Sequence, residues 1–238
     1  MILPLLLTLL TAGTPAFASS VTDRLDRAAD AALPESERMV AFNQLVMDWK
    51  TIRPELEALA KDDDADSRER WIAIRVMGQT GDKAALTPLL ALSEDPMPAI
   101  RSAASSALGD LGFAEACPRL EALLVDPAII VRVAAAEALG AIGDSRSVSA
   151  LAKALSDRSN YYRGSSLWVR VYYVNALGEI GSRSGIAPLI ACLDDKDPAV
   201  VDAALASLRK IVGYDFAEGR TREEHIEAWR RWAANEKL

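Results

Sequence analysis

The chain has 238 residues, a formal net charge of −7, and a hydrophobic content of 50% with only 6% aromatic residues. Ala and Leu supply much of the apolar content, which is typical of closely packed helices rather than of a β-sandwich. Proteins that bind duplex nucleic acid usually present a basic face to the phosphates, so this acidic chain is not expected to bind nucleic acid.

The first eighteen residues have the features of a secretory signal peptide. Residues 2–10 form a short apolar run, and Ala16-Phe17-Ala18 places small residues at the positions that a signal peptidase recognises. The run is too short to span a bilayer as a helix. We expect residues 1–18 to be removed and the mature chain to be exported to the periplasm or the extracellular space, with no integral membrane segment. Because the segment has no Lys or Arg, the alternative is an apolar N-terminus on a cytosolic protein.

Residues 19–62 predict an N-terminal helical cap of the kind that hides the end of a repeat array. A short helix over Asp23–Ala32 ends at Pro34, a second helix carries apolar residues from Met39 to Trp49, and Pro54 opens a third.

A repeat occupies residues 63–212. Pairs of glycines three residues apart recur at intervals of 31, 31 and 38 residues, at Gly78/Gly81, Gly109/Gly112, Gly140/Gly143 and Gly178/Gly181. Self-similarity with this period is typical of stacked helical repeats. A weaker copy starts at Asp197 and has Val212 where the second glycine would stand.

The unit that starts at Asp126 shows why the repeat folds as two helices. Asp126 suits an N-cap, Pro127 suits the first helical position, and Gly143 suits the left-handed residue after the helix. A second helix follows over Val148–Leu155. A single helical hairpin cannot bury both of its faces, so the units must stack. We expect an all-α, right-handed α-solenoid of stacked helical hairpins, whose second helices form the concave surface.

Charged residues accompany the repeat at fixed positions. Aspartates recur every 31 residues, and an arginine stands at the matching position of each first helix: Asp64, Asp95, Asp126 and Asp157, with Arg70, Arg101, Arg132 and Arg170. One hypothesis is a row of arginines that binds anions. We expect instead a structural ladder in which the guanidiniums bind loop carbonyls and the aspartates, because the loops between repeats need their polar groups satisfied.

Seven extra residues interrupt the period in the segment 158–169. Four of the five tyrosines and Trp168 lie within or just after this segment. Aromatic residues and Arg dominate binding hot spots. We therefore predict that the partner-binding residues are Tyr161, Tyr162, Arg163, Trp168 and Tyr172. The alternative is that the segment folds back and packs, with Tyr173 beneath it.

The two cysteines and the C-terminal segment predict structural roles. Cys117 and Cys192 replace apolar residues two repeats apart, so we expect two buried free thiols. Residues 213–238 form a capping loop and helix, in which Thr221 and Glu224 make a capping box. Trp229 and Trp232 share one face of this helix, and we expect them to cover the last repeat rather than to stack on a ligand.

The residues that carry the repeat resemble the HEAT-repeat family, and most closely the short bacterial type that is also found in phycobilin lyases. The match is the pattern Val-Arg-x-x-Ala-x-x-Ala-Leu-Gly-x-Ile-Gly-Asp at Val131–Asp144, with looser copies at residues 100–112 and 169–181. The resemblance covers residues 64–212. It implies an armadillo-type solenoid fold and leaves the function open, because such repeats serve many roles.

The sequence offers no set of residues for catalysis or metal binding. His225 is the only histidine, whereas catalytic zinc sites usually take three protein ligands. We expect no cofactor and no enzymatic activity. The predicted function is that of an exported scaffold, a monomer or part of a hetero-complex, that binds a protein or peptide partner through its solenoid surface and the insertion. The alternatives are a tetrapyrrole-handling protein like the phycobilin lyases and a structural subunit of an envelope complex.

Overall fold

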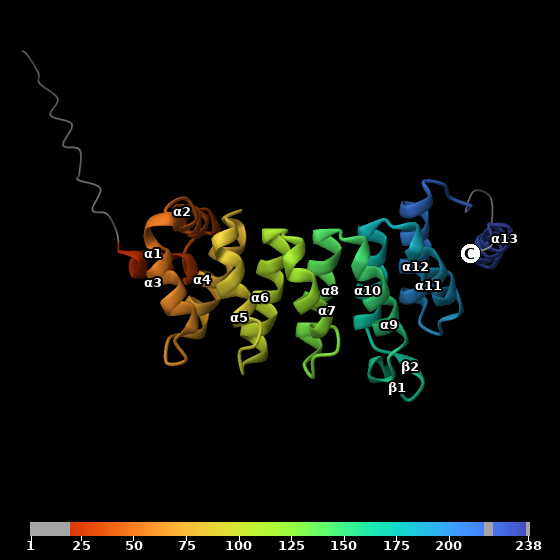
Figure 1. Cartoon of the computed structure of the whole chain (residues 1–238), viewed down its shortest axis with the longest axis horizontal. Coiled ribbons are helices and arrows are strands. Elements are labelled where there is room, and N and C mark those ends of the chain that lie inside the picture. The colour runs from red at the N-terminus through yellow and green to blue at the C-terminus, as the bar shows by residue number, and fades with distance from the viewer. Residues whose placement is uncertain (1–19, 217–220, 237–238) are drawn as a thin grey trace, which may run out of the picture.

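The structure is a computed structural model that describes residues 20–216 and 221–236. The predicted signal peptide, residues 1–18, lies outside the described residues. The chain is a stack of helical pairs with the first helices at one end and α13 (Arg222–Asn235) at the other (Figure 1). This arrangement confirms the all-α solenoid. No described helix is both long enough and apolar enough to cross a membrane.

The N-terminal end is built from three helices. These are α1 (Val21–Ala29), α2 (Glu35–Met47) and α3 (Trp49–Lys61). The prediction that Pro54 opens the third helix is wrong: α3 begins at Trp49 and holds Pro54 in its interior. The reason is that Asp48 ends α2 and starts α3, so a single residue turns the chain and the carbonyl of Asp48 accepts the N–H of Ile52.

Each repeat pairs a long helix with a short one. The long helices are α4 (Ser67–Gln79), α6 (Pro98–Leu111), α8 (Ile129–Ile142), α10 (Val169–Ile180) and α12 (Pro198–Val212). The short helices are α5 (Leu86–Leu92), α7 (Cys117–Leu123), α9 (Val148–Ser156) and α11 (Ile186–Ala191). A single 3-10 turn precedes each short helix, namely η1 (Lys83–Ala85), η2 (Ala114–Ala116), η3 (Ser145–Ser147) and η5 (Arg183–Gly185). A further turn, η6 (Cys192–Asp194), follows α11.

The aspartate before α8 acts differently from the prediction, whereas Asp197 caps α12. Asp126 Oδ1 accepts the Ala128 N–H at 2.8 Å, and α8 begins only at Ile129. Asp126 therefore closes the turn before the helix instead of capping it, and Pro127 lies in that turn. The same carboxylate also binds Arg101 of the preceding repeat.

The two glycines of each pair have different roles. The second glycine ends the long helix with positive φ, for example 78° at Gly112 and 73° at Gly143, as predicted. The first glycine lies where the next long helix passes: a Cβ added to Gly109 would stand 2.7 Å from Ala138 Cα. At Gly78, Gly109 and Gly178 the next long helix thus approaches too closely for a side chain, whereas a Cβ at Gly140 would stand 3.2 Å from Ala176 Cα.

The last repeat shows why the first glycine is present. The position that follows Gly178 by one period is Arg209, which is exposed because no further long helix packs against α12. The second glycine is not lost at Val212. Instead, α12 includes Val212 and ends at Gly213 with φ of 76°. The left-handed cap has moved by one residue.

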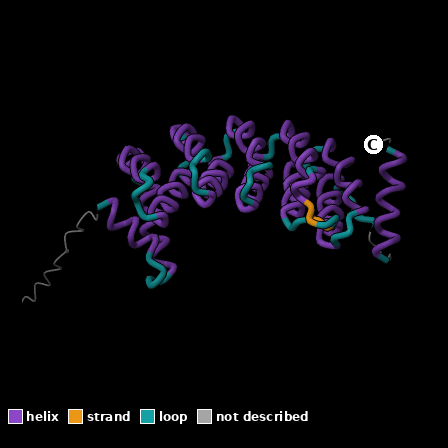
Figure 2. The backbone as a smooth tube through the Cα atoms, turned by 90° about the horizontal axis from the view of Figure 1, so that it is seen from below, coloured by secondary structure: helices purple, strands orange, loops and turns teal. Residues whose placement is uncertain are grey.

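The spacing of the two layers corrects the expected position of the concave surface. Long helices pack directly on one another, whereas the short helices do not pack closely on each other. In a curved stack (Figure 2), the layer with the shorter spacing is the inner one. The long helices, rather than the second helices, therefore line the concave side, and we call their exposed side the long-helix face.

The insertion forms a short β-hairpin, which the sequence analysis did not predict. After the turn η4 (Arg158–Asn160), strand β1 (Tyr161–Tyr162) pairs antiparallel with β2 (Ser165–Ser166). Arg163 and Gly164 form the turn with φ of 50° and 77°. Positive φ at both central residues is the geometry of a two-residue hairpin loop whose twist matches its strands. The hairpin projects from the edge of the stack (Figure 1).

The C-terminal helix covers the end of the stack. Trp229 is fully buried, and its ring lies 4.7 Å from Phe216 and 5.5 Å from Trp232. The capping box of Thr221 and Glu224 is present at the start of α13. The side chain of Trp229 therefore fills the core that α12 would otherwise expose.

Candidate functional site

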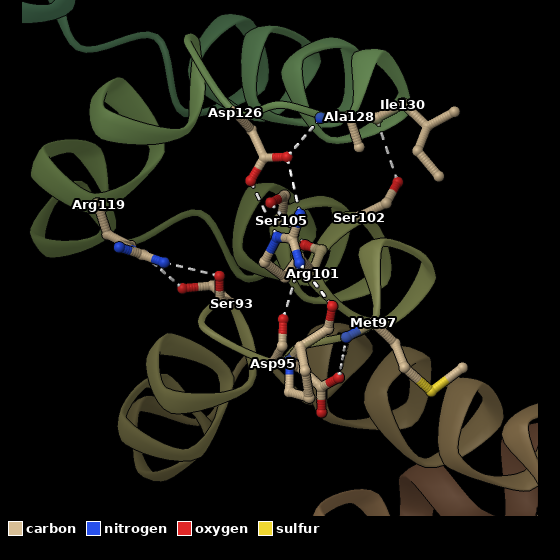
Figure 3. A network of polar contacts seen from close by, with 11 residues as sticks. Ser93, Asp95, Met97, Arg101, Ser102, Ser105, Arg119, Asp126, Ala128 and Ile130 are labelled. Carbon is tan, nitrogen blue, oxygen red and sulfur yellow. Dashed lines mark hydrogen bonds and ion pairs between the residues drawn. The ribbon is translucent and has the colours of Figure 1, made fainter.

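The arginine ladder joins each repeat to the next. Arg101 donates from Nε and Nη2 to the two carboxylate oxygens of Asp126, both at 2.9 Å (Figure 3). Its Nη1 donates to the carbonyl oxygens of Asp95 and Pro96 at 2.9 and 3.1 Å. One side chain therefore fixes two successive inter-repeat turns.

Two other arginines make the same kind of contact. Arg70 lies 2.5 Å from Asp95 and donates from Nε to the Ala60 carbonyl at 3.0 Å. Arg170 pairs with Asp195 and donates from Nε to the Leu155 carbonyl at 3.0 Å. The match between Ala60 and Leu155 shows that α3 occupies the place of a short repeat helix.

Arg132 departs from the ladder. It forms no ion pair with any described residue although it is buried. Its Nη1 donates to Asn160 Oδ1 at 2.5 Å, and its Nε has no hydrogen-bond partner in the described part of the chain. Asp157, the aspartate that the period assigns to it, accepts the Ser159 N–H at 2.8 Å as Asp126 accepts the Ala128 N–H, but Arg132 donates to Asn160 and not to Asp157. The ladder role predicted for Arg132 is corrected in this respect: its partner is an amide.

Asn160 is the residue that sequence reasoning missed. It is fully buried, and its Nδ2 donates to the Ala154 carbonyl at 2.8 Å. The backbone carbonyl of Asn160 accepts the Leu167 N–H at 2.9 Å, and this bond closes the base of the hairpin. The sequence shows only that an Asn stands three residues after the ladder aspartate Asp157. Its burial could not be predicted, because it depends on the two ends of the insertion meeting at Asn160 and Leu167.

Tyr173 completes this buried network. It is fully buried, and its hydroxyl donates to the Leu124 carbonyl at 2.9 Å. Leu124 follows the last turn of α7, so this bond satisfies a carbonyl that the helix leaves unpaired. Burial raises the pKa of Tyr173 to about 12. The side chain packs beneath the insertion, in a column that holds alanine in the other repeats.

The ladder carboxylates are held ionised. Burial by itself would raise the pKa of Asp126, but the hydrogen bonds from Arg101 and the Ala128 N–H outweigh it and lower the pKa below its usual value. For Asp195, burial is likewise outweighed by the Asp197 N–H and Arg170, so its pKa is also lowered. Both ion pairs are therefore fully formed at neutral pH.

Three of the predicted binding residues lie on the hairpin. Tyr161 stacks on the Arg170 guanidinium, 4.4 Å from its ring centroid, and donates to the Leu155 carbonyl at 3.3 Å. Tyr162 is 62% exposed, and the Arg163 guanidinium lies 5.3 Å from its ring. The Tyr161 side chain thus helps to fix the hairpin against α9 and α10, whereas the exposed side chains of Tyr162 and Arg163 can contact a partner.

The other two predicted residues lie on the long-helix face. Trp168 is the N-cap residue of α10 and is 49% exposed, and its ring meets Tyr172 edge to face at 5.6 Å. Tyr172 and Asn175 border a shallow hollow with Glu137 of α8. Partial burial raises the pKa of Glu137, which has no ion pair within the described residues.

The five predicted residues therefore form two groups. Tyr161 lies over the short helices and borders a hollow with Pro188 and Cys192 of the α11 region. Tyr172 borders a hollow between α8 and α10 on the other layer. The hairpin and the first turn of α10 direct these aromatic side chains to different sides of the stack.

The remaining chemically reactive side chains have structural surroundings. Cys117 and Cys192 are both buried and form no disulfide, and burial raises the pKa of the Cys192 thiol to about 11. His225 Nε2 lies 3.0 Å from Asp215 Oδ1 and accepts the Trp229 indole N–H at 3.0 Å. Among the described residues, no group of three or more His, Cys, Asp or Glu side chains is arranged to hold a metal ion.

Comparison with solved structures shows similar folds at low identity. The complex of CpcE and CpcF of phycocyanin lyase from Nostoc sp. PCC7120 is 22% identical over 85% of this chain and 81% of that chain, with a TM-score of 0.49. A designed armadillo repeat protein in complex with the peptide (KR)4 is 18% identical over 81% of this chain and 100% of that chain, with a TM-score of 0.48. No curated protein matches the chain.

The repeats themselves are assigned at the level of a family. The family profile for HEAT repeats matches residues 52–130, 86–169 and 161–234, which together cover more than half of the chain. The first of these segments begins within α3, in agreement with the repeat-like position of that helix. The chain therefore belongs to the HEAT repeat family.

Proposed function

We propose that this protein is an exported, non-enzymatic adaptor that binds a segment of a partner protein on its long-helix face. The observation that carries the proposal is the exposed Trp168, whose ring packs edge to face on the half-buried Tyr172. One repeat earlier, the same positions hold Ile130 and Ala134. The repeat that carries the insertion has thus replaced ordinary repeat residues with two aromatic rings on an accessible surface, and rigid aromatic anchors dominate binding energy.

The surroundings of this pair suit a polypeptide segment. Glu137 and Asn175 lie beside Tyr172 and supply a carboxylate and an amide at the rim of an apolar surface. The hairpin tip, with Tyr162 and Arg163, adds exposed contact area at the edge of the same repeat. The partner would be a segment with a basic or polar group beside an apolar anchor.

Site-specific photocrosslinking in cells tests the proposal. A photoreactive amino acid at Asn175 should yield a discrete crosslinked species, and the same amino acid at Thr87, which is exposed on a short helix, should not. The double variant Trp168→Ile/Tyr172→Ala restores the residues of the preceding repeat, so it should keep the fold and lose the crosslink. Equal crosslinking from Asn175 and Thr87, or an unchanged crosslink in the double variant, would contradict the proposal.

Export is tested separately. Cell fractionation should recover the protein outside the cytosol, and N-terminal sequencing should begin at Ser19, directly after Ala18. Recovery of a cytosolic protein that retains Met1 would disprove export. The binding surface would still be tested by the crosslinking experiment.

A further inference from the structure

A cavity of about 320 Å³ lies at the N-terminal end of the stack, on other helices than Trp168. It is open to solvent on one side and is bordered by α1, α2, α4 and α6, which come together at the N-terminal end of the array (Figure 1). The volume is in the range of pockets that hold small organic ligands. Its lining residues are Ala28, Ala29, Arg38, Ser67, Arg68, Trp71, Ile72, Ala99 and Ile100.

The charged groups in this lining are all positive. Arg38 and Arg68 line the cavity, and none of its lining residues is acidic. Arg38 Nε is buried without a hydrogen-bond partner among the described residues. Neither Arg38 nor Arg68 makes an ion pair with a residue that the structure describes, although most of the other described arginines do. A buried guanidinium N–H without an acceptor has a free-energy cost that an anionic ligand would remove.

The end of one helix adds to this positive potential. Ala99 and Ile100 belong to the first turn of α6, which no described side chain caps. The N-terminal end of a helix carries partial positive charge and unpaired N–H groups. Ser67 and Arg68 belong to the first turn of α4, whose N-terminal end is already capped, because the Asp66 carboxylate accepts the Arg68 N–H at 2.8 Å. Only α6 thus contributes a free positive end to the cavity that the two arginines line.

The rest of the cavity is apolar and preformed. Ala28, Ile72 and Ile100 are buried in its floor, and Trp71 stands at its side with 41% of its surface exposed. The Trp71 ring is held by the Arg75 guanidinium, which lies 4.8 Å from its centroid and 5.5 Å from that of Phe42. A ligand that replaces water here would bury apolar surface against a fixed indole.

We propose that this cavity is a binding site for a carboxylate attached to an apolar chain, with Arg38 and Arg68 on the carboxylate and Trp71 on the chain. Arginine suits carboxylates because its planar fork matches their two oxygens. The site goes beyond the adaptor function and does not depend on it, since it lies on other helices. Such a carboxylate comes either from a small amphipathic acid or from the free C-terminus of an apolar peptide.

Titration calorimetry with decanoate tests the site. Decanoate should bind to a single saturable site at least about tenfold more tightly than decyltrimethylammonium, which has the same alkyl chain and the opposite charge. Arg38→Gln and Arg68→Gln should each weaken decanoate binding by about tenfold, because each removes a charge-assisted hydrogen bond. The control Trp168→Ile/Tyr172→Ala should leave decanoate binding unchanged.

A pair of short peptides distinguishes the two sources. One peptide ends in Leu-Leu with a free carboxylate, and the other has the same sequence with a C-terminal amide. Displacement of decanoate by the free acid alone assigns the site to a peptide C-terminus, and binding of decanoate alone assigns it to a small acid. The proposal is overturned if the folded protein binds neither carboxylate, if it binds the cationic probe equally well, or if both arginine variants bind decanoate like the parent.

Discussion

The Arg132 guanidinium donates to Asn160 Oδ1 at 2.5 Å, whereas Arg101, one repeat earlier, binds both oxygens of Asp126. The two arginines occupy the same position of the repeat but face a neutral and a charged partner. The insertion causes this difference, because it moves Asp157 out of the ladder and brings a buried amide in its place. The base of the hairpin is thus tied to the core of the solenoid.

This contrast predicts unequal effects of removing the two arginines. Arg101→Met leaves the buried carboxylate of Asp126 without its partner and should destabilise the protein by about 3–5 kcal/mol. Arg132→Met leaves only a neutral amide acceptor and should cost about 1–3 kcal/mol. Urea unfolding of both variants measures the difference. An equal loss would show that the charge of Asp126 does not matter to the ladder.

Close packing of the long helices predicts a large effect of one added methyl group. Gly109→Ala places a Cβ 2.7 Å from Ala138 Cα, so the helices must separate. We expect a loss of about 1–3 kcal/mol in the free energy of unfolding. Gly140→Ala should cost less, because its nearest contact would be 3.2 Å. The order of the two urea midpoints checks the prediction, and the exposed Ser106→Ala is the control.

The ladder predicts a loss of stability in acid. The folded-state pKa values of Asp126 and Asp195 are lowered, so below about pH 4 the unfolded chain takes up protons more readily than the folded one. Stability is therefore present above that pH and is lost as the pH falls through the folded-state pKa values. Urea midpoints between about pH 5 and pH 3 should fall less steeply in Asp126→Asn than in the parent. The exposed Asp110→Asn should keep the parental slope.

Tyr173 predicts a late step in an alkaline titration. Its pKa is raised to about 12, so the absorbance change of one tyrosine should be delayed until the others have ionised or the protein unfolds. Because the unfolded chain ionises this group near pH 10, the contribution of Tyr173 to stability is present below that pH and is lost as the pH rises.

The variant Tyr173→Phe tests the assignment of this step. It should abolish the late absorbance change and cost about 1–3 kcal/mol, because the Leu124 carbonyl loses its donor in the core. If Tyr173→Phe instead removed an absorbance change that occurs near pH 10, the Tyr173 hydroxyl would be exposed to water. Tyr162→Phe, at an exposed position, provides the matched control.

The sequence by itself determined the features that depend on neighbouring residues. The period predicted the helical pairs, and the second glycines predicted the helix ends, because a left-handed residue is a local backbone requirement. The capping box before α13 and the burial of both cysteines follow from equally local patterns. The period and the glycine pairs recur along the array and therefore identify the fold.

Only the tertiary structure decided what lies between the units. The first glycines are needed because another helix passes within contact distance, and Arg209 shows that the need disappears where no such helix follows. Tyr161 and Trp168 are seven residues apart in sequence, yet a hairpin and a helix start direct them to different layers. Arg38 and Arg68 meet in one cavity because α2 packs on α4, a contact between segments whose sequences carry no common pattern.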